Sequence, residues 1–191
     1  LGDVYKRQIC NSIDVELSQF GEYNLSIEDL QALAAGSTDS CGVAWGFTSS
    51  DINQFSCAHV GPTPVTVTVV DNHGNASQCN TVINVLDVTP PAIYGVRQQA
   101  FSKYEGDYTI VQALEDVTAN DFCSGDLTAS ILVEAFDEED NPVSFPIPAD
   151  FDLQGGFSHT FTLRYSVADT SLNETWIDTT PVSYTHLTLP T

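Results

Sequence analysis

Basic residues are scarce in this sequence, and methionine is absent. Its 191 residues include 5 Lys and Arg against 26 Asp and Glu, which gives a formal net charge of −21 at pH 7. Such an excess of negative charge repels nucleic acid phosphates and anionic membrane surfaces, so we expect no nucleic acid partner. No apolar run is long enough to span a bilayer, so we also expect no membrane insertion.

Motifs of catalysis and of zinc binding are also missing. There is no CxxC or HxxxH spacing for zinc. Glu138, Glu139 and Asp140 stand side by side in a polar turn, whereas glycosidase acids face each other across a cleft. No nucleophile motif accompanies the histidines outside the terminal segments, which are His59, His73 and His159. The sequence therefore predicts a protein that is not an enzyme and has no catalytic residue.

Both ends of the sequence resemble translated sequencing adapter rather than protein. Residues 1–8 read LGDVYKRQ, and residues 182–191 read VSYTHLTLPT. We therefore expect the genuine chain to run from about Ile9 to Thr180, as an internal, metagenomic fragment of a longer protein.

The residues that are abundant indicate an exported β protein. Five cysteines with many Thr, Ser, Asp and Asn are typical of proteins from an oxidising compartment. With 42% hydrophobic residues arranged in alternating runs, the chain can bury a core. We expect an acidic all-β protein that is extracellular or held at the cell surface.

The clearest strand signal runs from Val65 to Asp87 and reads VTVTVVDNHGNASQCNTVINVLD. Two runs of period-2 alternation flank the turn DNHGN, which predicts a half-buried antiparallel hairpin. Gly61 to Pro64, GPTP, punctuates the chain before it. Pro90 and Pro91 follow it and mark a stiff junction, because proline cannot donate to a strand ladder.

Upstream of the hairpin, the sequence predicts a strand and a short helix. Residues 13–17, IDVEL, alternate, with Cys10 just before them. Ser26 is followed three residues later by Asp29 and then by an apolar run that ends at Gly36, which predicts a capped helix of one or two turns. The next run, VAWGFTS, predicts a strand with Trp45 as the first-choice core residue.

Beyond Pro91 the pattern begins again. Strand-like runs occur at residues 129–136, 143–147 and 159–169. Three markers recur in the same order: Gly21, Glu22 and Tyr23 match Gly106, Asp107 and Tyr108; Asp39, Ser40 and Cys41 match Asp121, Phe122 and Cys123; Asp71 and Asn75 match Asp169 and Asn173. This predicts two tandem immunoglobulin-like β-sandwiches, residues 9–87 with a short helix and residues 88–180 more divergent.

The ordered motifs DSCG, FSC, VTVTVVDNHGNASQC and VINVLDVTPP carry a resemblance over residues 9–91. They resemble the hyalin-repeat-like (HYR-like) and related bacterial immunoglobulin-like modules of Bacteroidota surface or secreted proteins. In the second unit Gly74 is replaced by Leu172, and the positions that match three of the first unit's cysteines hold none. The resemblance implies a non-catalytic spacer or adhesion module in a long repeat array, and it does not establish a ligand.

Four cysteines of the first unit can pair in three ways. Cys10 and Cys79 are expected on strands, while Cys41 and Cys57 are expected in turns that flank the Trp45 strand. We therefore predict the disulfides Cys10–Cys79 and Cys41–Cys57, with a zinc site as the disfavoured alternative. The fifth cysteine, Cys123, has no assigned partner.

Acidic and amide side chains offer a possible structural calcium site. Asp71, Asn75, Asp87 and Asp121 carry hard oxygen donors of the kind that calcium selects, although none belongs to an EF-hand. The simpler interpretation is that Asp and Asn form turns and keep an exported protein soluble, with no cofactor bound.

Two functions from different classes fit these features. The first is a structural or adhesive module whose partners are neighbouring repeat domains, with a glycan or protein as a further ligand. The second is a carbohydrate-binding or accessory module of a secreted glycoside-active enzyme. That function needs an exposed aromatic platform, to which Trp176, Tyr165 and Tyr104 could contribute.

Overall fold

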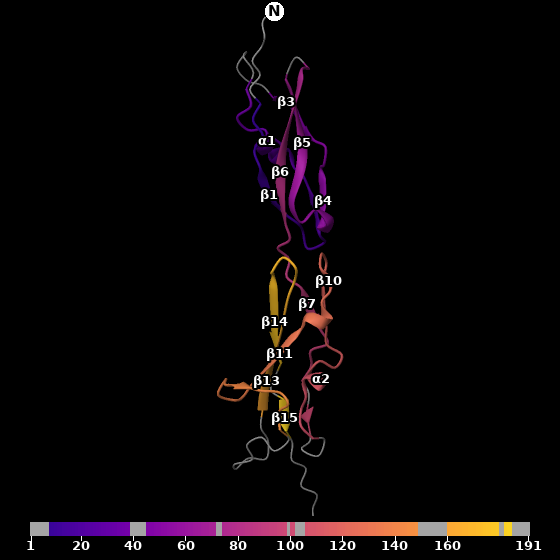
Figure 1. The fold of residues 1–191 in the computed structure, drawn as a ribbon, viewed down its shortest axis with the longest axis vertical. Helices are drawn as coiled ribbons and strands as arrows, with labels where there is room; N and C mark the ends of the chain where they lie inside the picture. The colour runs from indigo at the N-terminus through magenta and orange to yellow at the C-terminus, as the bar shows by residue number, and fades with distance from the viewer. Residues whose placement is uncertain are drawn as a thin grey trace, which may run out of the picture. The chain divides into compact units, whose positions relative to one another are not determined.

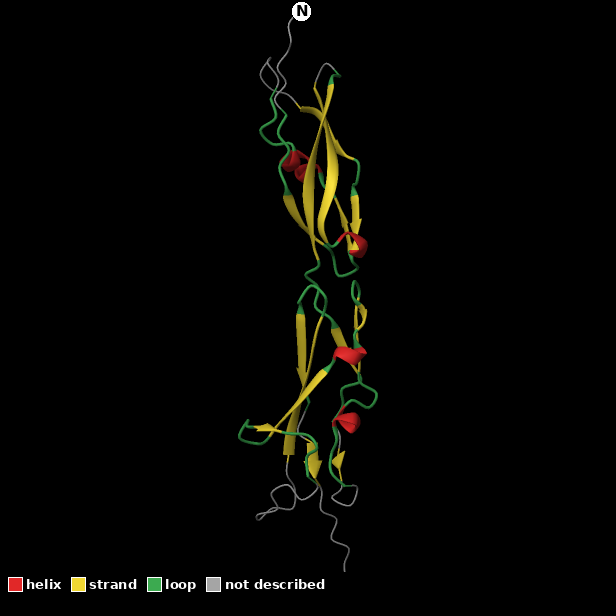
Figure 2. Cartoon of the chain, in the orientation of Figure 1, coloured by secondary structure: helices red, strands yellow, loops and turns green. Residues whose placement is uncertain are grey.

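A computed structural model of the chain describes residues 8–38, 45–71, 74–98, 100–101, 106–148, 160–179 and 182–184. Strands make up most of the regular structure, and the described residues contain two short α-helices (Figures 1 and 2). The chain divides into two compact units, Leu1–Thr89 and Pro90–Thr191. Both units are all-β, of the immunoglobulin-like sandwich type that the alternation predicts.

Unit 1 is built on a four-stranded sheet in the order β1-β6-β5-β3. Its strands are β1 (Ile13–Glu16), β3 (Trp45–Ser50), β5 (Gly61–Asp71) and β6 (Ala76–Leu86). A two-stranded sheet pairs β2 (Glu22–Asn24) with β4 (Gln54–Ser56), and the 3-10 helix η1 (Cys57–His59) follows. Buried side chains from β1, β4, β5 and β6 form the core, namely Val15, Phe55, Val65, Val67, Ile83 and Val85.

The predicted hairpin is present as β5 and β6, which pair antiparallel from Val70↔Ala76 to Gly61↔Val85. One prediction is wrong: GPTP does not precede the hairpin but forms the start of β5. Strand β3 pairs with β5 only from Val67 onward, so Pro62 and Pro64 lie where β5 has a strand on one side. A residue without an N–H is tolerated at such a position.

The predicted helix is α1 (Ile27–Leu33), and its first turn is capped as the sequence indicates. The Asp29 backbone N–H donates to the Ser26 hydroxyl at 3.1 Å, and the Ser26 N–H donates to the Asp29 carboxylate at 2.8 Å. Gly36 follows with a φ of 87°, the left-handed conformation that glycine adopts most easily. Leu33 is fully buried, so the helix closes one part of the unit 1 core.

Unit 2 contains a three-stranded sheet in the order β10-β9-β7 and a six-stranded sheet. The first holds β7 (Ala92–Tyr94), β9 (Thr118–Asp121) and β10 (Gly125–Asp126). The second runs β12-β11-β13-β15-β8, with β14 paired to β13. Its strands are β8 (Ala100–Phe101), β11 (Leu132–Phe136), β12 (Pro142–Val143), β13 (Thr160–Ala168), β14 (Glu174–Asp178) and β15 (Val182–Tyr184). Strand β15 falls in the segment that resembles adapter.

The core of unit 2 is the clearest case of alternation. Every second residue of β13 is buried: Phe161, Leu163, Tyr165 and Val167. They pack with Ile93 of β7, Ala119 of β9 and Val133 of β11, so the core draws on both sheets. The Tyr165 hydroxyl donates to the Ala113 carbonyl at 2.8 Å, which satisfies a polar group inside the core.

Unit 2 also contains a helix that the sequence analysis did not predict. Helix α2 (Ile110–Ala113) begins after Thr109, whose hydroxyl accepts the Gln112 N–H, while the Gln112 side chain accepts the Thr109 N–H. The Thr-x-x-Gln spacing is that of a capping box, and it could have predicted this helix from the sequence. The 3-10 helix η3 (Thr128–Ser130) leads into β11.

Candidate functional site

The disulfide of unit 1 joins the segment just before its first strand to its last strand. Cys10, just before β1, is bonded to Cys79 in β6, with their Cα atoms 6.2 Å apart and a separation of 69 positions in sequence. This confirms the predicted Cys10–Cys79 pair. Cys41 lies outside the described residues, so the Cys41–Cys57 pair stays a prediction.

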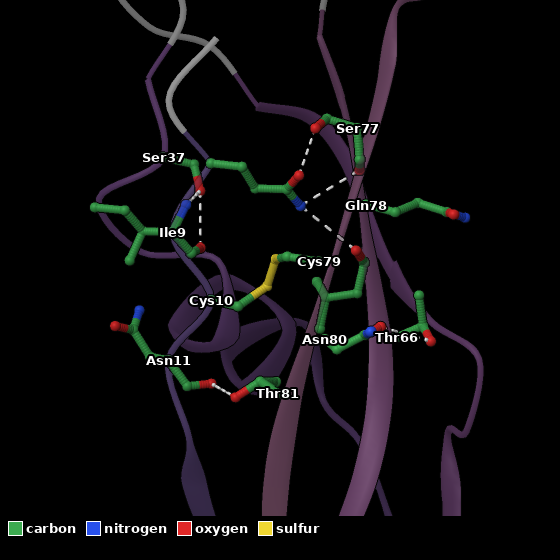
Figure 3. Close-up of a disulfide and its surroundings, with 12 residues drawn as sticks. Ile9, Cys10, Asn11, Ser37, Thr66, Ser77, Gln78, Cys79, Asn80 and Thr81 are labelled. Atoms are coloured by element: carbon green, nitrogen blue, oxygen red, sulfur yellow. Dashed lines mark hydrogen bonds between the residues drawn. A yellow bond between two sulfur atoms is a disulfide. The ribbon is translucent and has the colours of Figure 1, made fainter.

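Hydrogen bonds fix the chain on both sides of this disulfide (Figure 3). The Ile9 backbone N–H donates to the Ser37 hydroxyl, which in turn donates to the Ile9 carbonyl, both at 2.9 Å. The Asn11 N–H donates to the Leu33 carbonyl at 2.8 Å, and the Asn11 carbonyl accepts the Thr81 hydroxyl at 2.9 Å. The segment that enters unit 1 is therefore anchored to the end of α1 and to β6.

Strands β1 and β6 pair parallel, from Ile13↔Ile83 to Glu16↔Leu86. The Leu17 N–H extends this ladder by donating to the Leu86 carbonyl at 2.9 Å. Because the two strands run in the same direction, the chain enters unit 1 at one end of the shared ladder and leaves at the other. The disulfide lies at the entry end.

The predicted calcium ligands do not form one site. Asp71 ends β5 and Asn75 precedes β6, so both lie at the turn end of the hairpin, whereas Asp87 follows the far end of β6. Eleven strand residues separate the two ends, roughly 35 Å at the usual rise per residue. A single ion therefore cannot bind Asp71, Asn75 and Asp87, and a prediction that groups them is wrong.

Asp87 itself is buried, 7% exposed, at the base of β6. Its Oδ1 accepts the Thr89 N–H at 3.2 Å, which is a turn-forming contact. Its role as a calcium ligand stays a prediction.

Asp121 belongs to unit 2 and lies close to a residue that the predicted set omits. Carboxylate oxygens of Asp121 and Asp169 lie within 4.8 Å of each other, and both residues are buried. Asp121 accepts the N–H groups of Cys123 and Ser124, at 2.8 and 2.7 Å. Asp169 accepts the Asn173 backbone N–H at 2.8 Å. The repeated Asp and Asn at the β13–β14 turn was the signal for Asp169, and calcium binding by Asp121 stays a prediction.

The residues weighed as catalytic lie at a helix cap or on an exposed turn where the structure describes them. His59 Nδ1 accepts the Ser56 N–H at 3.1 Å, so this imidazole caps η1. Glu138, Glu139 and Asp140 lie on an exposed turn between β11 and β12, as the sequence indicates. His73 and His159 lie outside the described residues.

The aromatic platform required for carbohydrate binding is reduced to one described member. Trp176 on β14 is 62% exposed, whereas Tyr165 is fully buried, and burial raises the pKa of its hydroxyl. Tyr104 lies outside the described residues, as does the side chain of Trp45. Of the three candidates for stacking on a sugar, Trp176 is therefore the one that is exposed among the described residues.

Comparisons with known proteins show weak likeness only. No family model and no curated protein matches the chain. Its fold is similar to the protocadherin gamma B7 extracellular cadherin domains 1–4, with 14% identity, a TM-score of 0.38, and 96% of this chain and 50% of that chain covered. Its similarity to mouse clustered PcdhgC3 EC1-3 has 12% identity and a TM-score of 0.39, with 96% of this chain and 68% of that chain covered. Its similarity to human mucin-like protocadherin EC1-2 has 12% identity and a TM-score of 0.35, with 95% of this chain and 97% of that chain covered.

The chain thus spans half the length of the protocadherin gamma B7 structure that it matches. Similarity at this level carries no argument about function.

Among the described residues, no helix is long and apolar enough to cross a membrane.

Proposed function

We propose that this chain is a non-catalytic structural module of an exported repeat protein, a spacer or stalk of the HYR-like type that presents binding surfaces to its surroundings. The observation that carries this proposal is the Cys10–Cys79 disulfide at the entry of a unit whose first and last strands pair parallel. Disulfides persist in oxidising compartments, which supports an extracellular or cell-surface location.

When the disulfide is absent, the parallel pairing of β1 and β6 makes unit 1 resistant to tension along the chain. Pulling the chain at both ends moves β1 and β6 in opposite directions along their shared ladder. All the hydrogen bonds of that ladder are then loaded together rather than one after another. A module that must keep its length within a stalk benefits from this arrangement.

The disulfide removes most of unit 1 from the path of tension altogether. A pulling force that enters at Cys10 passes through the sulfur bridge to Cys79 and leaves along the rest of β6. The residues between the two cysteines carry no sustained tension. Residues 80–86 are already in an extended strand with about 3.3 Å per residue, so pulling them straight adds little length.

Force–extension measurements on the full chain, with handles at both ends, test this proposal. Cys41, Cys57 and Cys123 are replaced by serine, so that Cys10–Cys79 is the one disulfide that can form. In the oxidised protein we expect unit 1 to add almost no length when it unfolds. After reduction it should add about 230 Å, because 69 residues are released at about 3.4 Å each.

The extension of unit 2 serves as the internal control, because it should be the same in both redox states. Equal total extension before and after reduction would contradict the proposal, since the disulfide would then not shorten the path of tension. Circular dichroism of the triple serine variant checks that it is folded before pulling.

A further inference from the structure

One face of unit 2 combines exposed apolar side chains with a high density of charge. It is the outward face of β11, β13 and β14, here called the Trp176 face, with Leu132, Glu134, Arg164, Glu174, Trp176 and Asp178 at its surface. Cross-strand pairing fixes two rows: Leu132↔Ser166↔Trp176, and Glu134↔Arg164↔Asp178. Directly paired residues share a face of the sheet, so the members of each row are neighbours.

The apolar row of this face is open to solvent. Trp176 is 62% exposed and Leu132 is 67% exposed, and the half-buried Ser166 lies between them. Two strand spacings separate Leu132 from Trp176, about 10 Å, so the short serine leaves a shallow step between two larger side chains. Exposed tryptophan is unusual on a solvated surface and is enriched where proteins bind partners.

The Trp176 indole is held in place from one side. The Arg164 guanidinium carbon lies 5.3 Å from the Trp176 ring centroid and 5.1 Å from that of Phe136, so the cation stacks between two aromatic rings. The same guanidinium forms two hydrogen bonds to the Asp178 carboxylate, at 2.8 and 2.9 Å. A contact made by Trp176 therefore requires little loss of side-chain freedom.

Negative charge exceeds positive charge on this face. Glu134, Glu174 and Asp178 lie on the strands, and Asp140 lies on the adjoining β11–β12 turn, against one guanidinium. The hydrogen bonds to Asp178 raise the pKa of Arg164, and the charges of Asp140 and Glu134 act in the same direction. The surplus of carboxylates is not neutralised by Arg164 and favours a cationic partner.

We propose that the Trp176 face is a docking surface for a basic segment of a protein partner, with an arginine or lysine of that segment over the exposed part of the Trp176 indole and others paired with Glu134 and Glu174. The surface supplies the two elements that such a segment needs, an aromatic ring for a cation–π contact and carboxylates around it. A second copy of this chain fits poorly, because each copy carries a net charge of −21. This inference concerns unit 2 and does not depend on the mechanical role of unit 1.

Titration calorimetry of the full chain with a nona-arginine peptide, in about 0.15 M salt to screen distant charges, tests this proposal. We expect Trp176→Ala to weaken binding at least tenfold, and Trp176→Phe to restore part of the loss. Phe122→Ala is the matched control, because Phe122 is an equally exposed aromatic residue of unit 2, at 62%. It should change the affinity less than twofold.

Charge controls separate docking from general attraction. Glu134→Gln and Glu174→Gln should each weaken binding about threefold, whereas Glu115→Gln, an exposed acid on another part of unit 2, should have no effect. Equal effects of all three, or an unchanged affinity in Trp176→Ala, would overturn the proposal in favour of non-specific attraction. So would the absence of peptide binding, or quenching of Trp176 fluorescence by neutral cellohexaose instead, which would assign the face to a glycan.

Discussion

Unit 1 and unit 2 are β-sandwiches that are held together by different means. In unit 1 a disulfide closes a span of 69 residues, and hydrogen bonds anchor the entering segment on both sides of it. Unit 2 contains a single cysteine, so no disulfide can form within it. Its core instead includes two tyrosines that are almost fully buried, Tyr108 and Tyr165, and the second of them bonds the end of α2.

The difference separates two ways of stabilising a fold. A disulfide acts mainly by restricting the unfolded chain, and its effect grows with the length of the span that it closes. A buried, hydrogen-bonded side chain acts on the folded state and is lost when the core opens. The stability of unit 1 should therefore depend on the Cys10–Cys79 bond, and that of unit 2 on its buried tyrosine, which the following experiments test from the largest expected effect to the smallest.

Removal of the Cys10–Cys79 disulfide should affect unit 1 alone. Closing a 69-residue span is worth about 4 kcal/mol by the chain-entropy relation, a large part of the stability of a small domain. Denaturant unfolding measures this loss when Cys10→Ser and Cys79→Ser are added to the triple serine variant, in which Cys41, Cys57 and Cys123 are already serine. The chain has one tryptophan in each unit, Trp45 and Trp176, so Trp45→Phe and Trp176→Phe forms report the two units separately. An equal loss in both units would contradict the assignment.

Tyr165→Phe should affect unit 2 alone. The substitution removes the 2.8 Å hydrogen bond to the Ala113 carbonyl and leaves that acceptor buried, so a loss of about 1–2 kcal/mol is expected. Tyr94→Phe is the control, because Tyr94 is 58% exposed and its hydroxyl should contribute little. Unit 1 should unfold at the same denaturant concentration in all three proteins; a shift there would show that the two units are not independent.

The hairpin turns of the two units carry different residues at one matching position, and the two residues can be exchanged. Gly74 in unit 1 has a φ of 83°, and Leu172 at the matching position of unit 2 has a φ of 67°, in the left-handed region that a leucine rarely adopts. Leu172 is 85% exposed, and a Cβ at Gly74 would meet nothing within 4 Å, so packing does not enter. Leu172→Gly should stabilise unit 2 by about 1 kcal/mol, and Gly74→Leu should destabilise unit 1 by about as much. Thermal melts that move in the same direction for both would contradict this reason.

The smallest effect expected is a dependence of unit 1 stability on pH. Burial, the hydrogen bond to Asp29 and its charge together raise the pKa of Tyr23 to about 12. This stabilisation is complete below the unfolded pKa of about 10 and is lost as the pH rises toward 12. Burial raises the pKa of Asp29, but hydrogen bonds from Ser26 and Tyr23 outweigh it and lower that pKa overall. Its stabilisation is present above pH of about 4 and is lost on acidification.

Tyr23→Phe tests this linkage because it removes the alkaline contribution of the pair without changing the helix cap. The fall in unit 1 melting temperature between pH 10 and 12 should become shallower in Tyr23→Phe, while unit 2 should be unchanged. An unaltered slope would show that Tyr23 does not titrate with folding.

Local patterns were sufficient to predict much of the fold. Alternation located β5, β6 and β13, and the Ser26 and Asp29 spacing located α1, because these signals depend only on neighbours in the chain. The start of β5 was missed because its two prolines indicated a break before the strand. Proline is excluded only from strands that are paired on both sides, and this part of β5 is paired on one side. Helix α2 was missed although Thr109 and Gln112 carried a usable signal.

The candidate sites were harder to predict, because they depend on which strands become neighbours. Cys10 and Cys79 could be paired from their expected places on strands. The sequence did not show that Asp169 lies beside Asp121, that Asp71 and Asp87 lie at opposite ends of unit 1, or that Arg164 meets Asp178. Each of these follows from strand register and sandwich topology, which one sequence leaves open.

Cutting the chain inside the disulfide span tests the central claim most directly. A protease site inserted in the exposed turn at residues 51–53, in the triple serine background, allows the backbone to be cleaved between Cys10 and Cys79. If tension bypasses this span, a cleaved and oxidised molecule held between two handles should keep its tether under force, and the tether should break when reductant is added. Loss of the tether upon cleavage, before any reduction, would contradict the account.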